Sequence, residues 1–310
     1  SGSRRTRTDP GGTVPGVMVI AAGCFLFSAV SAASGQEAPE RVLVRTGDRG
    51  PQGTLPVDRG AALLHHRLQK LTTTASVLYT TGHPDDEEAG VLTLLSRGMG
   101  VRTALLALNR GEGGANAIGA ELFDGLGLIR SEELRLAGRY YALDDQYFTT
   151  AVDYGYSKTF EEALRSWDRE AVLGDMVRII RTNRPLVVIS RWHGSARDGH
   201  GHHQAAGILT PEAVEAAADP RRFPEQIADE GLRPWRVLRL FRGRLQPDEA
   251  EDAQLDPFVV SPWLGESYQA FGSFGLSLQR SQTAGRQRTQ RVATPARYEL
   301  LVGTPLPADD

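Results

Sequence analysis

Two short segments of this chain carry residue types that could do chemistry. The first, His83-Pro84-Asp85-Asp86-Glu87, places a histidine and neighbouring carboxylates directly after an apolar run. The second, His200-Gly201-His202-His203, brings imidazoles three residues apart much later in the chain. Neutral imidazole and carboxylate are common ligands of a hydrolytic divalent metal, which needs three protein ligands and an open position for water. The two segments therefore predict a metal-dependent hydrolase.

The residue types also suggest a role for each member. His83, Asp86 and His203 supply the three metal ligands. Asp85 can project toward the metal-bound water and act as the general base. His200, three residues before His203, can stabilise the oxyanion and protonate the leaving amine. An acidic helix N-terminus or a solvated histidine cluster would give similar sequences, but the coincidence of both segments favours the metal site.

The flanking sequence predicts an α/β fold in which each segment follows a strand. Residues 76–80 form a short β-rich run, 87–97 have the apolar spacing of a helix, and 101–108 form a second strand. This succession indicates a βαβ unit and hence a parallel sheet. Residues 185–190 are almost wholly apolar, as in a strand buried on both faces. Since open parallel sheets bind ligands at the carboxyl ends of their strands, we expect both segments on one rim of one sheet.

Weaker patterns predict the remaining elements, namely helices at 59–71, 131–143, 160–181 and 204–218 and a strand at 237–241. The glycine-rich loop at 109–119 could be taken for a dinucleotide-binding turn. It lacks the G-x-G-x-x-G order, follows the second strand rather than the first, and carries Glu112 where a pyrophosphate would lie. No nucleotide cofactor is therefore expected.

The composition fits one enzyme-sized domain. The chain has 310 residues, of which 40% are hydrophobic and 24% charged, enough to bury one large core. The formal net charge is only -3, and apart from Lys70 and Lys158 the positive charge is arginine spread along the chain. No basic stripe is present, so we expect no nucleic-acid partner.

The N-terminal stretch has the pattern of an export signal. Arginines at positions 4, 5 and 7 precede an apolar run at 14–30, and small residues suited to a signal peptidase follow at 31–36. The run is short and interrupted by glycine, proline and serine, so we expect no stable membrane insertion once the signal is removed. The expected location is periplasmic or extracellular.

Cys24 is the only cysteine, and the apolar run continues past it, which does not favour a lipid-anchored cysteine. The processed chain would contain no thiol, which excludes disulfides and thiolate metal sites. We therefore divide the chain into an export signal at 1–35, a lead-in segment and helix at 36–72, a single catalytic domain at 73–300, and a linker at 301–310 to which a further domain could be attached.

The two segments resemble the signature motifs of the PIG-L/LmbE-like family of zinc-dependent N-deacetylases, which includes N-acetylglucosaminyl-phosphatidylinositol and mycothiol-pathway deacetylases. The resemblance runs from about residue 75 to about residue 206. It implies a Rossmann-like, mostly parallel sheet flanked by helices, and Zn²⁺ held by His83, Asp86 and His203. It also implies Asp85 as base and His200 as acid, acting on a small-molecule or glycan substrate. Two imidazoles and a carboxylate also accept iron or cobalt.

Other residues match or depart from the family pattern. Arg110-Gly111-Glu112 and Arg130-Ser131-Glu132-Glu133 resemble elements near its substrate, so Glu112 and Arg130 are expected to contact sugar hydroxyls. The alternative for Arg130 is a surface salt bridge.

Gly201-His202 replaces the Pro-Asp that many members have, and we expect Asp198 to support His200 instead. Gln279-Arg280-Ser281-Gln282 resembles a late family element with glutamine in place of histidine, and the sequence assigns it no role.

The sequence thus predicts an exported zinc hydrolase that removes an N-acetyl group from an amino sugar or its conjugate. One alternative is a zinc amidase for a larger acyl or peptide-like amide. That enzyme would need a roomier cleft, for which the candidate aromatic residues are Tyr140, Tyr141, Tyr147, Tyr154, Tyr156, Trp192, Trp263 and Tyr268. The other is a non-catalytic carbohydrate-binding module, against which Asp85 and His200 argue because such a module needs neither.

Overall fold

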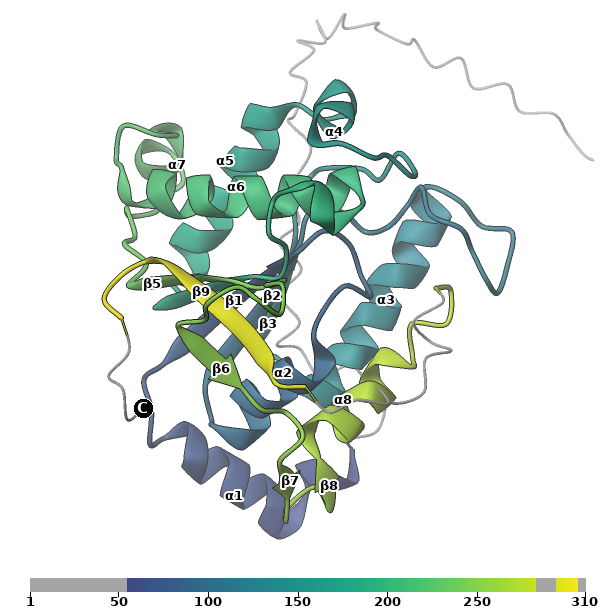
Figure 1. Ribbon diagram of the computed structural model, residues 1–310, viewed down its shortest axis with the longest axis vertical. Helices are drawn as coiled ribbons and strands as arrows, with labels where there is room; N and C mark the ends of the chain where they lie inside the picture. The colour runs from purple at the N-terminus through teal and green to yellow at the C-terminus, as the bar shows by residue number, and fades with distance from the viewer. Residues whose placement is uncertain (1–54, 283–293, 306–310) are drawn as a thin grey trace, which may run out of the picture. The chain divides into compact units, whose positions relative to one another are not determined.

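The computed structural model describes residues 55–282 and 294–305. The expected export signal therefore lies outside the described residues. Within them, seven strands form one mixed sheet in the order β3-β2-β1-β4-β5-β9-β6, and helices pack against both of its faces (Figure 1). The strands of this sheet are β1 Ser76–Thr81, β2 Arg102–Ala107, β3 Asp145–Phe148, β4 Val187–Ser190, β5 Arg239–Arg242, β6 Ala253–Leu255 and β9 Ala296–Val302. A separate hairpin joins β7 Val260–Ser261 to β8 Glu266–Ser267.

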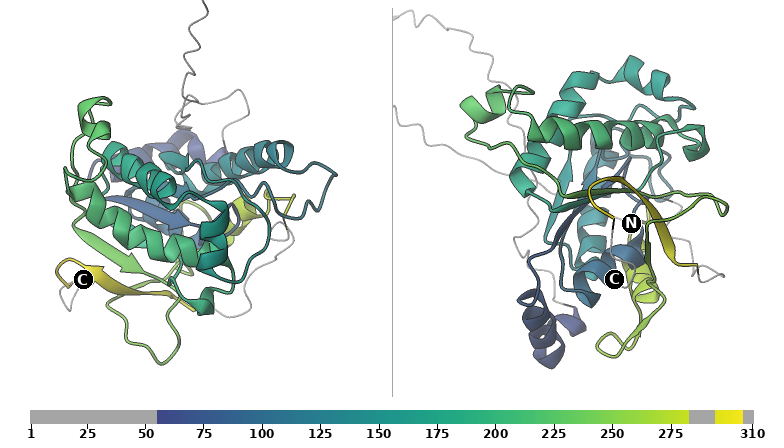
Figure 2. Two further views of the ribbon diagram at one scale, coloured as in Figure 1. Left: turned by 90° about the horizontal axis from the view of Figure 1, so that it is seen from above. Right: turned by 60° about the vertical axis from the view of Figure 1, so that its left-hand side comes forward.

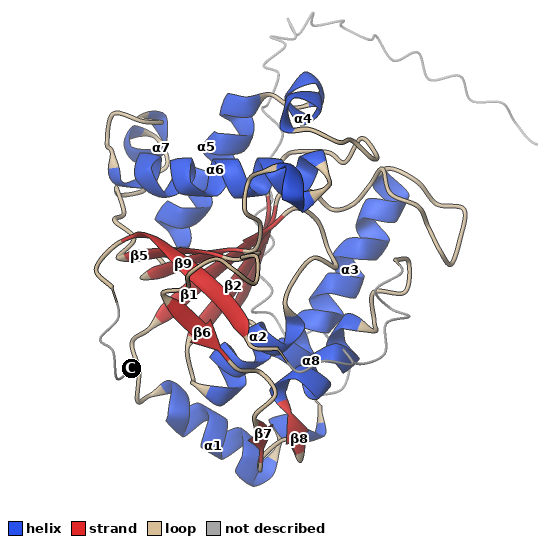
Figure 3. Ribbon diagram, viewed as in Figure 1, coloured by secondary structure: helices blue, strands red, loops and turns tan. Residues whose placement is uncertain are grey.

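The helices form two layers around the sheet (Figure 2, Figure 3). Their bounds are α1 Gly60–Lys70, α2 Ala89–Thr93, α3 Asp124–Tyr141, α4 Phe160–Ser166, α5 Arg169–Asn183, α6 Gly201–Ala218, α7 Glu225–Ala228 and α8 Tyr268–Leu276. Alternate residues of β1 enter different cores: Leu78 packs with the apolar residues of α5 and α6, and Tyr79 with those of α2 and α3. In the described part of the chain, no helix is both long and apolar enough to cross a bilayer.

The centre of the sheet confirms the predicted α/β class with mostly parallel strands. β1 pairs in parallel with both β2 and β4, so the predicted βαβ unit is present. β3 and β5 extend the parallel part, whereas β9 runs antiparallel to β5 and β6. The chain leaves β1 toward β2 and β3 on one side, and leaves β4 toward β5 on the other. The carboxyl ends of β1 and β4 thus flank the topological switch point, where open sheets of this kind bind ligands.

Several helix boundaries differ from the prediction. The single helix predicted at 160–181 is two helices, because Trp167 leaves the helical conformation and Asp168 caps α5 by accepting a hydrogen bond from Ala171 N at 3.1 Å. α3 begins at Asp124, seven residues before the predicted start at 131. The helix predicted at 87–97 is the short α2 followed by a π-helical turn at Leu94–Gly98. The periodicity located the apolar faces but not the caps.

Three strands of the sheet were not predicted. β3 is a strand of only four residues at the sheet edge, and because it begins with the polar residues Asp145 and Gln146 it lacks the apolar pattern of a strand. β6 is shorter still, with three residues. β9 continues to Val302, so it ends inside the segment that the sequence assigned to a linker. These strands depend on pairing with partners distant in sequence, which local patterns do not encode.

Candidate metal centre and active site

The two predicted segments meet at the switch point. The first forms the loop after β1, and the second begins α6 after the long loop that follows β4. One nitrogen each of His83 and His203 and one oxygen of Asp86 lie within 4.8 Å of one another. His203 Nε2 lies 3.3 Å from His83 Nε2 and 3.1 Å from Asp86 Oδ1. Two imidazole nitrogens at this distance need a proton or a cation between them, so the donor set suits a divalent ion.

Asp86 is oriented by its own loop and by the loop after β4. Its Oδ2 accepts hydrogen bonds from Gly82 N at 3.1 Å, His83 N at 3.0 Å and Trp192 Nε1 at 3.3 Å. Burial opposes ionisation, but His83 and His203 outweigh it and hold the pKa of Asp86 well below its usual range. The three donors occupy one carboxylate oxygen, which leaves Oδ1 directed at His203 and available to a metal.

His203 is fixed in both tautomer and orientation. Its Nδ1 lies 3.0 Å from Asp198 O, which can only accept, so Nδ1 carries the proton and Nε2 the lone pair. Trp192 stacks on its ring with centroids 3.7 Å apart and planes 8° apart. Such outer contacts hold metal-binding histidines in place. Trp192, which the sequence suggested only as a wall of a roomier cleft, therefore touches two of the three candidate ligands, Asp86 and His203.

Asp85 has a left-handed backbone, with φ at 88°. A non-glycine residue held there costs about 1–3 kcal/mol, and such strain gathers at functional sites. The loop is braced by Asp85 N, which donates to Glu87 Oε2 at 3.0 Å. Asp85 Oδ1 lies 3.4 Å from His83 Nδ1, and burial raises the pKa of the Asp85 carboxyl. The structure therefore places this carboxylate beside the candidate ligands, and its role as the general base remains a prediction.

His200 is the N-terminal cap residue of α6, and its ring faces the same centre. The ring centroids of His200 and His203 are 5.0 Å apart. His200 Nδ1 lies 3.1 Å from Ser157 O, so the neutral ring carries its proton on Nδ1 and offers Nε2 to the site. Burial and the nearby His83 and His203 lower the pKa of His200 to about 4.

Asp198 does not support His200 as we expected. Its carboxylate instead accepts hydrogen bonds from the backbone N–H groups of three residues in its own loop, His193, Gly194 and Ser195. The reason is local: Asp198 lies in a 3-10 turn that closes this loop, so its side chain folds back on the preceding residues. The carbonyl of Ser157, on a different loop, takes the place of the expected carboxylate.

His202, between the two functional histidines, is fully buried. Its ring stacks on Trp167 with centroids 4.7 Å apart, and neither nitrogen has a hydrogen-bond partner among the described residues. Its Nδ1 is 3.9 Å from Asp153 Oδ2, and burial lowers its pKa to about 2. His202 also forms a second compact histidine group with His83 and His200. In place of a carboxylate, this chain has a neutral ring packed under His200.

Glu112 and Arg130 hold loops together. Glu112 Oε2 accepts hydrogen bonds from Arg110 N at 3.0 Å and Asp153 N at 3.1 Å, and burial raises its pKa. Arg130 is buried in α3 and donates to Gly111 O, to Ala115 O at 2.8 Å and to Ser281 Oγ at 3.3 Å. Its guanidinium is buried and is therefore not part of a surface salt bridge. The structure thus gives both residues a role in shaping the glycine-rich loop, and their contact with substrate remains a prediction.

The late segment 279–282 is part of the site's support. Gln279 Nε2 donates to the buried carboxylate of Glu87, which also accepts from Tyr141 OH at 2.9 Å. Ser281 Oγ donates to Glu133 Oε2 at 2.6 Å. The segment therefore ties the loop after β1 to α3. Its resemblance to a late family element could have indicated that the segment lies near the site, although the sequence analysis gave Gln279 no role.

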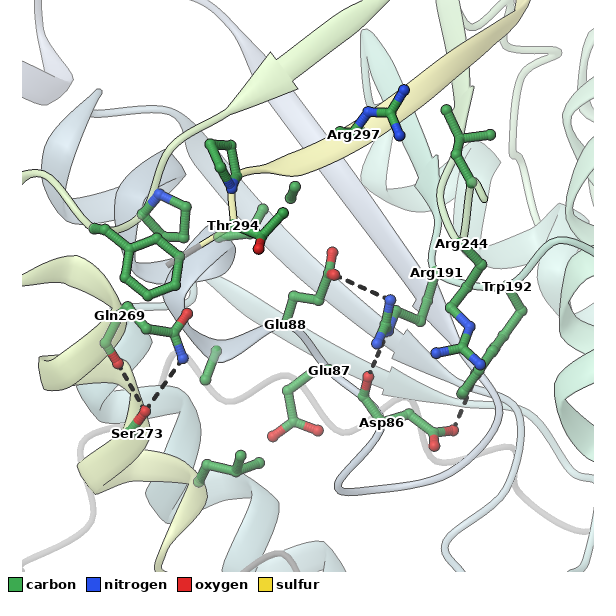
Figure 4. Close-up of a pocket in the computed structure, with 18 of the residues that line it drawn as sticks. Asp86, Glu87, Glu88, Arg191, Trp192, Arg244, Gln269, Ser273, Thr294 and Arg297 are labelled. Atoms are coloured by element: carbon green, nitrogen blue, oxygen red, sulfur yellow. Dashed lines mark hydrogen bonds and ion pairs between the residues drawn. The ribbon is translucent and has the colours of Figure 1, made fainter. Parts of the chain in front are cut away.

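A cavity of about 950 Å³ opens beside the centre (Figure 4). Asp85 and Asp86 line it, whereas the three histidines of the candidate site do not. Of the eight aromatic residues proposed for a roomier cleft, only Trp192 lines this cavity, and Phe258 is its other aromatic wall. The others lie elsewhere in the described structure: Tyr141 and Tyr147 are core residues, and Trp263 stacks on His65.

Comparison with known proteins agrees with this geometry. Residues 78–214 match the model of the PIG-L family, described as GlcNAc-PI de-N-acetylase. A 1D-myo-inositol 2-acetamido-2-deoxy-alpha-D-glucopyranoside deacetylase from Saccharopolyspora erythraea is 28% identical over 206 residues, which cover 57% of this chain and 70% of that protein.

Solved structures share the fold. The N,N'-diacetylchitobiose deacetylase of Pyrococcus horikoshii matches with a TM-score of 0.55 at 19% identity, over 75% of this chain and 86% of that protein. The 4-carboxy-2-hydroxymuconate hydratase of Pseudomonas putida matches with a TM-score of 0.50 at 15% identity, over 76% of this chain and 99% of that protein. A hydratase on the same scaffold means that the fold alone does not define the reaction. The sequence match is more specific: residues 78–214 of this chain match the PIG-L family model.

Proposed function

We propose that this protein is a metal-dependent deacetylase that hydrolyses the N-acetyl group of an amino-sugar conjugate. The observation that carries the proposal is the convergence of His83, Asp86 and His203 on one point with Asp85 beside them. The family match and the deacetylase relative supply the reaction class. The cavity of about 950 Å³ favours a conjugate over a free monosaccharide, because it exceeds the space that one sugar ring needs.

The chain's own residues then have separate tasks. His83, Asp86 and His203 would hold the metal, which when bound polarises the amide carbonyl and acidifies a water. Asp85 takes a proton from the attacking water on its carboxylate. His200, whose Nδ1 is held by Ser157 O, must first take up a proton at Nε2, which it then donates to the leaving amine as the C–N bond breaks and acetate leaves. Burial of these groups strengthens each electrostatic contact.

Asp85→Asn tests this assignment. The variant keeps the shape of the side chain but cannot accept the proton, so we expect it to fold, to bind metal and to lose about 10²- to 10⁴-fold in kcat. The assay is acetate release from acetylated monosaccharides, chitin fragments, peptidoglycan pieces and glycolipid headgroups, with chelated protein as the blank. Asp229→Asn, at an exposed position after α7, is the matched control. Near-normal turnover by Asp85→Asn would exclude Asp85 as the base.

We also propose zinc as the metal and export as the destination. Two imidazoles and a carboxylate are a ligand set that zinc accepts. Elemental analysis of protein purified without added metal, followed by reconstitution with zinc, iron or cobalt, tests the first point; higher turnover with iron or cobalt would reject zinc.

Export rests on the pattern of residues 1–35. Fusing those residues to a reporter that is active only outside the cytoplasm tests it, and an inactive fusion would reject export.

A further inference from the structure

Three arginines line the cavity, and one of them is unlike the other two. Arg191 pairs with Glu88 Oε1 at 3.0 Å and donates to Asp86 O at 3.1 Å. Arg297 pairs with Glu251 and also donates to backbone carbonyls. Arg244 has no carboxylate partner among residues 55–282 and 294–305. Its guanidinium lies over the Trp192 ring, 5.1 Å from the centroid, as that of Arg191 also does. The cavity therefore contains one cation whose charge no described acidic side chain neutralises.

The backbone at Arg244 is also unusual. It has a φ of 62°, in the left-handed region that favours glycine, although glycine occupies the preceding position, 243. This conformation costs about 1–2 kcal/mol for a residue with a side chain. Such strain is concentrated at ligand-binding and catalytic positions, and Asp85, which lines the same cavity, also has a left-handed backbone. Arg244 is exposed, so its guanidinium is accessible to a ligand.

Trp192 connects this cation to the candidate centre. The same ring that supports Arg244 donates its Nε1–H to Asp86 Oδ2 and stacks on His203. Figure 4 shows Arg244 and Trp192 on the side of the cavity next to Asp86, with Gln269 and Ser273 on the opposite wall. The cation thus lies one aromatic ring from the metal ligands, and hydroxyl and amide groups suited to sugar hydroxyls face it.

We propose that Arg244 binds an anionic group on the substrate, so that the preferred substrate is an acidic amino-sugar conjugate bearing a carboxylate or a phosphate. This inference rests on the proposed function for its acetamide position, which lies at Asp85. The planar guanidinium donates two parallel hydrogen bonds to either anion. The remainder of the conjugate lies along the cavity toward Gln269 and Ser273.

The kinetic test compares Arg244→Gln with the parent enzyme on three substrates. These are N-acetylglucosamine 1-phosphate, N-acetylmuramic acid and the neutral methyl N-acetylglucosaminide. A hydrogen bond to a charged group contributes enough that we expect the kcat/KM ratio of acidic over neutral substrate to fall about 10- to 100-fold. Arg244→Lys should restore part of the ratio, because it keeps the charge but not the fork. Arg221→Gln, at a side chain that is 88% exposed, controls for net charge.

A binding measurement separates this inference from the proposed reaction. Calorimetry with glucosamine 1-phosphate and muramic acid needs no turnover, and the parent should bind at least one of them about 10- to 100-fold more tightly than Arg244→Gln. The tighter ligand identifies phosphate or carboxylate as the anion. If no sugar is deacetylated but this difference is found, the proposed reaction fails and the anion site stands. Equal affinities in parent and variant, absence of binding to the parent, or an unchanged kcat/KM ratio would overturn the role of Arg244.

Discussion

Four consecutive acidic residues after β1 serve two different purposes. Asp85 and Asp86 face His83 and His203 with contacts of 3.1 to 3.4 Å. The two Nε2 atoms of His83 and His203 are 3.3 Å apart, a distance that requires a proton or a cation between them. This half of the loop holds opposed donor atoms around a point where a cation would relieve their repulsion. We refer to it as the ligand half.

Glu87 and Glu88 form the anchoring half, in which each carboxylate has its partners. Glu88 binds Arg191 at 3.0 Å and accepts hydrogen bonds from Tyr79 OH at 2.9 Å and Tyr298 OH at 2.8 Å. These partners come from β1, the loop after β4, and β9. Asp85 and Asp86 can remain available to a ligand because Glu87 and Glu88 fix the loop through contacts that need no ligand.

Asp86→Asn should break the ligand half with the largest effect. The amide oxygen can still accept from Gly82 N and His83 N, so the loop should keep its shape, but the negative charge that a cation needs is lost. We expect turnover to fall by about 10³-fold or more, because the metal no longer stabilises the transition state. Adding metal should raise the unfolding free energy of the parent by up to about 4 kcal/mol and that of the variant much less. Thermal unfolding with and without chelator measures this, and equal metal stabilisation in both proteins would refute Asp86 as a ligand.

Glu88→Gln should break the anchoring half. It leaves Arg191 without its carboxylate in a largely buried position, where the side chain is 19% exposed. Loss of one partner of a buried ion pair costs about 3 kcal/mol of unfolding free energy. Glu132→Gln removes an exposed carboxylate that pairs with Arg135, and should cost less than about 1 kcal/mol. Chemical denaturation of metal-free protein measures both, and equal costs would mean that Glu88 does not anchor the loop.

The pH dependence of metal binding sharpens the comparison further. Burial disfavours a charged His83, but the carboxylates of Asp86 and Asp85 outweigh it and raise the pKa of His83 to about 10 in the metal-free protein. Because the pKa of His83 is higher in the folded than in the unfolded protein, its protonation stabilises the fold. This contribution is complete below the pKa of the unfolded state and is lost as pH rises through about 10. The metal must displace that proton, so affinity should increase about tenfold per pH unit from about pH 7 to about pH 9. Competition against a chromophoric chelator measures it, and a flat profile would show that His83 is already neutral.

The ligand half could be predicted from the sequence, whereas most of the anchoring half could not. Histidine and carboxylate spacings are local, and apolar runs placed them after β1 and β4, at the rim where the structure has them. Tyr298 belongs to β9, which was not predicted, and Gln279 follows α8, far along the chain from its partner Glu87. Their roles depend on tertiary contacts between distant residues. The hydrogen bonds of Arg130 to the carbonyls of Gly111 and Ala115 could not be predicted either, because only the folded loop presents those groups.

Trp192→Phe tests the boundary between the two halves and should have the smallest effect. Phenylalanine keeps an aromatic ring against His203 but removes the indole N–H that lies 3.3 Å from Asp86 Oδ2. Two backbone donors still hold that oxygen, at 3.1 Å from Gly82 N and 3.0 Å from His83 N. We therefore expect metal affinity to fall only about tenfold, at the low end of what loss of such outer contacts costs. Metal titration of the purified variant measures this. A loss as large as that of Asp86→Asn would mean that the indole, rather than the loop backbone, orients the carboxylate, and that the ligand half depends on the loop after β4 for its geometry.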